Sequence, residues 1–217
     1  MWPRGYPLNQ INKPYVNDHV YTKRKTSWIQ SGLVDGNPDV DAIFKMTRSI
    51  DSWSMFDTYA PSMQLPKFRF APYNAQNTFY WKEAFWALYL PVTHTFKVTD
   101  IWRSYWAQRL IWLLGGSVQF SRPNASFRQR KNHSYSSDYN EETKLYSQTG
   151  ALLEFLSKWE CFKTEFYDCI IDLSQQMVDK KFWEQADIRG VQNWLKDLDS
   201  MGYPQPKMVQ SIYVKIG

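Results

Sequence analysis

The stretch FKVTDIWRSYWAQRLIWLLGG, from Phe96 to Gly116, carries three tryptophans, a tyrosine and two arginines, but only one carboxylate. Thr99 is a residue type that often caps the amino-terminus of a helix, and the Gly115-Gly116 pair is typical of a helix end. We therefore predict a helix that starts after Thr99 and runs to Leu114. Because aromatic side chains bury well, most of the tryptophans are expected in the core.

Asp100 is the single carboxylate of this stretch, and the prediction makes it the second residue of the capped helix. The helix macrodipole favours the ionised form of an acid at that position. An ionised carboxylate can act as a base or accept hydrogen bonds from substrate hydroxyls. The alternative is ordinary helix-start chemistry, with Arg103 one turn further on as the ion-pair partner.

Local patterns predict strands and helices in the first part of the chain and helices alone in the last part. SWIQSGLVDG at 27–36 is predicted as a strand, after which Asn37 can cap a short helix that has Pro38 at its first position. Further expected elements are a possible strand at 74–81, a helix at 82–90 stopped by Pro91, a strand or loop at 93–98, a short strand at 117–120, a polar loop at 121–140, and helices near 141–159, 162–180 and 185–200. This order predicts an α/β part at 1–138 and a mainly helical extension at 139–217.

The composition is that of a globular protein with a high content of aromatic residues. The chain has 217 residues, 43% of them hydrophobic, and includes 11 Trp, 14 Tyr and 13 Phe. This content suits thick core packing, or a surface on which sugar rings or bases stack. The net charge is +5, but the densest basic run is the short FRQRK at 127–131. A run of that length does not indicate nucleic-acid binding, so we expect no nucleic-acid partner.

The two cysteines, Cys161 and Cys169, lie eight residues apart in a segment that is predicted to be helical. Within one straight helix this separation places the two residues about 12 Å apart along the axis, which is too far for a disulfide. No metal-binding motif includes either cysteine. The sequence therefore predicts two unpaired thiols.

Two sequons point to a lumenal domain. Asn124-Ala-Ser and Asn132-His-Ser both fit the acceptor pattern for N-glycosylation, within one polar loop. Chance matches to this pattern are the alternative. No apolar run approaches 18 residues, and the first five residues lack the apolar region of a signal peptide. A lumenal home would therefore require a targeting segment upstream of this chain.

Several other polar residues could carry chemistry, each with a plain structural alternative. The amides of Asn74, Gln76 and Asn77 suit sugar binding because an amide both donates and accepts, although such residues also form turns. His133 lies in the polar loop, where it is either solvated or a metal ligand. The acids Asp39 and Asp41 fit a helix start better than a metal site.

Four segments together resemble the STELLO-type family of probable Golgi glycosyltransferases. They are RGYPL at 4–8, GLVDGNPDVDAIFKMT at 32–47, APYNAQNTFYWKEAFWALYLPVT at 71–93 and DIWRSYWAQRL at 100–110. The likeness spans most of residues 2–150. A more distant one joins the chain to the reversibly glycosylated polypeptides, the UDP-arabinopyranose mutases, through the same Arg-Gly-Tyr-Pro, Gly-Leu, Pro-Asp, Asp-x-Trp and His-Ser elements.

By this resemblance the fold is a GT-A-like α/β glycosyltransferase domain, which binds a nucleotide-sugar at the carboxyl ends of its strands. Such domains hold Mn²⁺ or Mg²⁺ on an aspartate cluster that lies upstream of the Arg-Gly-Tyr-Pro segment. No such cluster precedes Arg4 in this chain. We therefore expect an acceptor-side portion whose donor-binding half is missing, so that this chain alone has no transferase activity.

The resemblance also implies roles for individual residues and a location. The expected partners are a nucleotide-sugar, a glycan acceptor and other Golgi glycosyltransferases, in the Golgi lumen, with membrane attachment only through a segment outside this chain. The rival interpretation is a non-catalytic glycosyltransferase-like protein that binds sugar or scaffolds Golgi enzymes. The implied site residues are Asp100 as catalytic base or acceptor contact, His133 as metal ligand, and Arg4, Asn74, Gln76, Asn77, Trp102 and Arg103 as substrate-binding residues.

Overall fold

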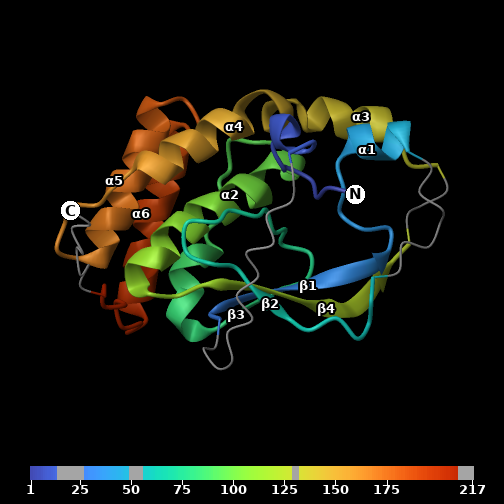
Figure 1. Ribbon diagram of the computed structural model, residues 1–217. Coiled ribbons are helices and arrows are strands. Elements are labelled where there is room, and N and C mark those ends of the chain that lie inside the picture. The colour runs from blue at the N-terminus through green and yellow to red at the C-terminus, as the bar shows by residue number, and fades with distance from the viewer. Residues whose placement is uncertain (14–26, 49–55, 129–131, 210–217) are drawn as a thin grey trace, which may run out of the picture.

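An open, mixed four-stranded sheet forms the base of the molecule in the computed structural model, which describes residues 1–13, 27–48, 56–128 and 132–209. The strand order is β2-β4-β1-β3 (Figure 1). The central strands β1 (Ile29–Gly36) and β4 (Val118–Phe127) are parallel. The edge strands β2 (Met63–Gln64) and β3 (Thr78–Tyr80) pair antiparallel with β4 and β1. The expected mixture of strands and helices is thus confirmed.

The helices follow the predicted order, and those of the second half of the chain are confirmed. In that half the chain forms α4 (Thr143–Lys158), α5 (Phe166–Asp179) and α6 (Gln185–Ser200). The helix predicted at 82–90 is present as the 3-10 helix η2 (Lys82–Leu88). The remaining helices are α1 (Ala42–Thr47), α2 (Phe96–Ile111), α3 (Tyr135–Glu141) and the short 3-10 turns η1 (Leu8–Gln10) and η3 (Trp112–Leu114).

The start of α2 corrects the predicted one. The amino-terminal cap is Thr95, whereas the Thr99 hydroxyl donates to the carbonyl of Pro91 at 3.1 Å. A residue far along the chain holds the segment before the helix, because the Asp187 carboxylate accepts from the backbone N–H of Val92 at 2.7 Å. Asp100 is consequently the fifth residue of α2, one turn beyond the end where the macrodipole acts most strongly.

Two further local predictions are wrong. Asp41, not Asn37, caps α1, and its carboxylate accepts from the backbone N–H of Phe44 at 2.7 Å. Asn37 instead extends the sheet, since its N–H donates to the carbonyl of Phe127 at 2.9 Å. The loop predicted at 121–140 is partly regular, because β4 runs to Phe127 and α3 begins at Tyr135. The polar side chains of this part of β4 did not indicate a strand, because the strand is held by pairing of its backbone.

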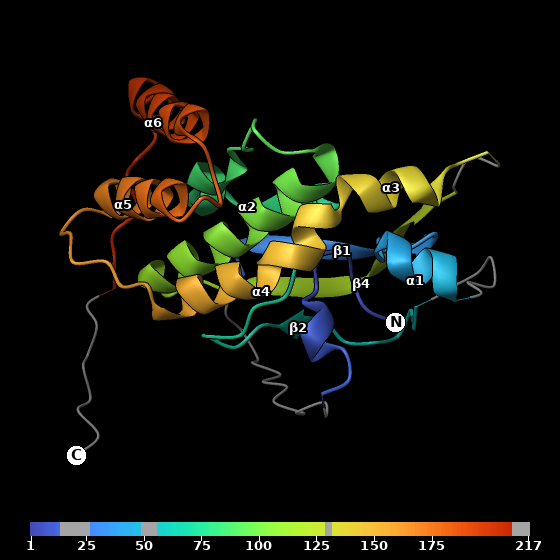
Figure 2. The same ribbon diagram turned by 90° about the horizontal axis from the view of Figure 1, so that it is seen from above.

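One hydrophobic core joins the sheet to the helices, with α2 running through it (Figure 2). Trp102 and Trp106 of α2 are fully buried, as predicted for this stretch. The core includes Ile29 of β1 and Leu152 of α4, together with residues of α5 and α6. The helices after residue 138 therefore pack onto the α/β part through shared apolar contacts.

The cysteines contradict the sequence-based prediction, because Cys161 and Cys169 form a disulfide. Helix α4 ends at Lys158 and α5 begins at Phe166, so Cys161 lies in the connection and not in a helix. The turn brings the two Cα atoms to 5.6 Å, within the range that a disulfide requires. The assumption of one straight helix was the error.

Across the described part of the chain, no helix combines the length and the apolar character needed to cross a membrane.

Candidate functional site

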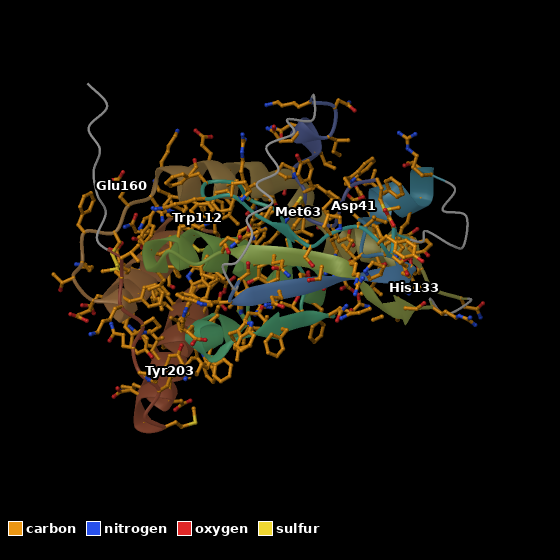
Figure 3. All side chains as sticks on the ribbon, turned by 60° about the horizontal axis from the view of Figure 1, so that its bottom comes forward. Asp41, Met63, Trp112, His133, Glu160 and Tyr203 are labelled. Atoms are coloured by element: carbon orange, nitrogen blue, oxygen red, sulfur yellow. A yellow bond between two sulfur atoms is a disulfide. The ribbon has the colours of Figure 1, made fainter. Side chains whose placement is uncertain are left out.

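A pocket of about 360 Å³ lies against the middle of β1 and against residues 38–40, which follow this strand. Its sheet side is formed by residues 31–34 of β1, Phe120 of β4 and Met63 of β2, which Figure 3 labels. The amino-terminal residues 1–4 and the segment 71–74 close other sides. Open α/β sheets commonly bind ligands beyond the carboxyl ends of their strands, and residues 38–40, which follow the carboxyl end of β1, form part of this pocket.

Arg4 brings two carboxylates together at the edge of this pocket. Its Nε and Nη2 donate to the two oxygens of Asp39 at 2.8 and 2.9 Å. Its Nη1 and Nη2 donate to the two oxygens of Asp100, each at 3.1 Å, and Nη1 also donates to the carbonyl of Lys97. These five bonds engage all five N–H groups of the guanidinium. Arg4 therefore holds the two acids and has no further donor for a ligand.

The electrostatics of this cluster favour the charged forms of Arg4 and Asp39. Burial disfavours the charged guanidinium, but Asp39 and Asp100 outweigh it and raise the pKa of Arg4. Burial likewise acts to raise the pKa of Asp39, but the charge and hydrogen bonds of Arg4 and a hydrogen bond from Asn74 bring this pKa below its usual value. Asp39 is therefore ionised at neutral pH.

Asp39 and Asp100 face different surroundings. Asp39 lines the pocket, and about a quarter of its side chain, 26%, is exposed. Asp100 is 14% exposed, is absent from the pocket lining, and accepts from the backbone N–H of Ala75 at 3.1 Å. The geometry thus favours Asp39 over Asp100 as the carboxylate that meets a ligand.

The predicted amide cluster divides into a pocket part and a sheet part. Asn74 and Gln76 line the pocket, and the Asn74 amide donates to Asp39 at 2.6 Å. Asn77 instead joins strands, since its amide donates to the carbonyl of Gly32 at 3.1 Å and to the side-chain oxygen of Asn124 at 2.6 Å. Of the three, Asn74 and Gln76 have the position that substrate binding requires.

Trp102 and Arg103 lie in the core and do not line the pocket. Trp102 is fully buried and its indole N–H donates to the Thr149 hydroxyl at 3.2 Å. Arg103 is 2% exposed, donates to the carbonyl of Ala87 at 2.9 Å and lies over the ring of Tyr80. The geometry therefore gives no support to the substrate contacts that were predicted for these two residues.

His133 lies at the start of α3, apart from the pocket lining. Its Nε2 is 2.7 Å from a carboxylate oxygen of Asp138, and the other oxygen of Asp138 pairs with Lys97 at 3.1 Å. Burial acts to raise the pKa of Asp138, but hydrogen bonds from His133 and Lys97 bring it below its usual value. Among the described residues no group of three or more His, Cys, Asp or Glu side chains could hold a metal ion. The metal role of His133 stays a prediction.

Both sequon asparagines are exposed, but in different settings. Asn124 lies in β4 and its side-chain oxygen is bound by Asn77, whereas Asn132 precedes α3. Whether either carries a glycan stays a prediction.

Sequence reasoning assigned Asp39 to a helix start and missed its place at the pocket. The available signal was the Pro-Asp pair directly after a predicted strand. Residues that follow the carboxyl end of a strand lie at the edge where open α/β sheets bind ligands. The pairing with Arg4 spans 35 residues and has no local signature.

The fold is that of an α/β protein with a pocket whose volume falls in the range of small-molecule sites. The sequence model of the family described as STELLO glycosyltransferases matches residues 97–216. The chain is 36% identical over 214 residues to "Probable glycosyltransferase STELLO1" and 35% identical over 214 residues to "Probable glycosyltransferase STELLO2", both from Arabidopsis thaliana. Each alignment covers 96% of this chain. The chain belongs to the STELLO glycosyltransferase family, and it spans 27% and 28% of the length of these two relatives.

Proposed function

We propose that this chain forms the acceptor-binding portion of a GT-A-like glycosyltransferase that uses a nucleotide-sugar donor. The observation that carries the proposal is the ionised carboxylate of Asp39 on the wall of a pocket that lies against β1. Membership of a glycosyltransferase family supplies the reaction class.

In this proposal Asp39 receives the acceptor hydroxyl. The carboxylate accepts a hydrogen bond from the hydroxyl and so orients its oxygen toward the donor sugar. During transfer the acceptor oxygen bonds to the anomeric carbon of the donor sugar, and the bond from that carbon to the diphosphate breaks. The hydroxyl proton passes to the carboxylate of Asp39. Arg4 and Asn74 fix the orientation of Asp39 through their hydrogen bonds.

Among the described residues no group of three or more His, Cys, Asp or Glu side chains could hold the Mn²⁺ or Mg²⁺ ion of the donor. The relatives are longer than this chain. We propose that the donor diphosphate and its metal ion bind in a portion of such a protein that this chain does not span. In that arrangement His133 would approach the metal ion or the diphosphate from this chain, and Asp138 would orient the ring of His133.

We further propose a Golgi lumenal location. The disulfide between Cys161 and Cys169 supports it, because disulfides persist in oxidising compartments and are rare in the cytosol. The exposed asparagines of the two sequons, Asn124 and Asn132, agree with it. Expression through a secretory pathway should yield a protein whose mass falls on endoglycosidase treatment. A secreted protein whose mass does not change would count against this location.

A chimera tests the proposed function. Residues 1–217 replace the aligned region of the STELLO1 relative, and the chimera and this chain alone are each incubated with UDP- and GDP-sugars and Mn²⁺. We expect transfer or donor hydrolysis by the chimera and none by the chain alone. A folded chimera without turnover would favour the rival, non-catalytic interpretation. Turnover by the chain alone would refute the proposal that the donor binds in a portion that this chain does not span.

A further inference from the structure

The walls of the pocket are formed mostly by apolar groups. Apolar side chains reach it from several separate parts of the chain, and six of them are Trp2, Leu33, Val34, Phe56, Met63 and Phe120. Its volume, about 360 Å³, falls within the usual range for small-molecule sites. An apolar pocket of this size favours a ligand that brings apolar surface into it.

Three polar residues of the pocket, Arg4, Asp39 and Asn74, form one cluster, and most of its hydrogen-bonding capacity is already used. All five donors of Arg4 are engaged by Asp39, Asp100 and the carbonyl of Lys97. The Asn74 side chain donates to Asp39 and accepts from the backbone N–H of Gln76 at 3.0 Å.

Asp39 keeps room for one more hydrogen bond. A carboxylate offers roughly four acceptor positions. Three hydrogen bonds from Arg4 and Asn74 reach Asp39. The remaining position suits a single ligand hydroxyl at the pocket edge.

A bare monosaccharide does not match this arrangement. Hydroxyl groups surround a pyranose ring, and each one that is buried without a partner reduces affinity. Besides the vacant acceptor position of Asp39, the pocket lining includes the Gln76 amide and the Ser31 hydroxyl, and its other walls are mostly apolar. A ligand with one hydroxyl beside an apolar group satisfies both features.

We propose that the pocket takes an amphipathic acceptor, whose apolar group, an aryl ring or alkyl chain, fills the space over β1 and whose hydroxyl meets Asp39. The word acceptor rests on the proposed function. The preference for an apolar group rests on the pocket alone, so the two are tested separately.

Calorimetry on the complete chain tests the preference with two ligands that share one sugar, phenyl β-glucoside and methyl β-glucoside. We expect the phenyl compound to bind about 10-fold tighter or more, because its ring leaves water. Equal affinities, or tighter binding of the methyl compound, would overturn the proposal.

A matched pair of substitutions locates the binding. Met63 lines the pocket, whereas Met46 on α1 does not and is 46% exposed. We expect Met63→Gln to reduce the phenyl advantage at least about threefold and Met46→Gln to leave it unchanged, with melting temperatures that verify folding. A phenyl advantage that a folded Met63→Gln protein retains in full would overturn the proposal.

Turnover of the chimera separates this inference from the proposed function. Transfer at equal rates to both glucosides would refute the amphipathic acceptor and leave the glycosyltransferase function intact. An inactive chimera, together with selective phenyl binding by the chain, would refute the function and leave the apolar preference standing.

Discussion

The two ends of α2 hold buried arginines in different ways. Near its amino-terminal end, Arg4 meets the carboxylates of Asp39 and Asp100. Near its carboxyl end, Arg109 donates to the carbonyls of Leu156 and Trp159, each at 3.1 Å. Burial acts to lower the pKa of both arginines, but the carboxylates raise that of Arg4 above its usual value, while that of Arg109 falls below it.

The charge of Arg4 positions two carboxylates, whereas the charge of Arg109 stabilises the end of α4. At the first end, Arg4 and two carboxylates are concentrated beside a pocket and are joined by hydrogen bonds. At the second end, Arg109 satisfies carbonyls at the end of α4 and lies 4.8 Å from the Trp159 ring centroid. Loss of charge should therefore disturb the first end more than the second.

The largest stability effect is expected for Arg4→Leu. The substitution leaves Asp39 and Asp100 close together and partly buried without their cation, and removing one partner of a buried ion pair typically costs about 3–5 kcal/mol. Urea unfolding of this variant and of the wild type measures the loss. A loss below about 1 kcal/mol would show that the two acids do not depend on Arg4.

A smaller loss is expected when the disulfide is removed by Cys161→Ser. The bond closes a loop of eight residues beside Trp159, whose carbonyl binds Arg109. Chain entropy predicts a loss of about 2–3 kcal/mol for a loop of this length. Unfolding of the wild type with and without a reducing agent provides the control. If reduction lowers the stability of Cys161→Ser as much as that of the wild type, the disulfide is not the cause.

Arg109→Met should cost less again, about 1–2 kcal/mol, because it leaves carbonyls of the α4 end unpaired but also removes a buried charge. Methionine retains much of the packing volume. Comparison of its unfolding free energy with that of Arg4→Leu tests the contrast between the two ends of α2. A loss equal to or larger than that of Arg4→Leu would contradict it.

The smallest effect concerns pH. The pKa of Asp39 is lower in the folded state than its ordinary 3.8, so its contribution to stability is present above that value and is lost as the pH falls through the folded-state pKa. The stability advantage of the wild type over Asp39→Asn should therefore shrink between about pH 7 and pH 3. An advantage that grows on acidification would contradict the sign of this shift.

Local signals predicted the regular elements well where one segment determines them. The strand at β1 and the three carboxyl-terminal helices followed from residue types and periodicity alone. The start of α2 was wrong because Asp187, far along the chain, fixes the segment before it. The disulfide was missed because the point where α4 ends determines whether Cys161 can turn toward Cys169.

The candidate site was predictable in its members more than in its geometry. Arg4, Asn74 and Asp100 were named from the sequence, and the structure joins them through Asp39. The predicted order of importance assumed that Asp100 opens a helix. Its actual position one turn inside α2, and its bonds to Arg4 and Ala75, depend on contacts between segments that sequence patterns do not show.

The most direct test compares Asp39→Asn with Asp100→Asn in the chimera, by transfer rate and melting temperature. Both amides preserve the shape of the side chain. If Asp39 receives the acceptor, its amide variant should lose at least about 100-fold in rate, as expected for a lost base, while Asp100→Asn loses less than about tenfold. A loss with Asp100→Asn that equals or exceeds the loss with Asp39→Asn, at an unchanged melting temperature, would contradict the assignment of Asp39.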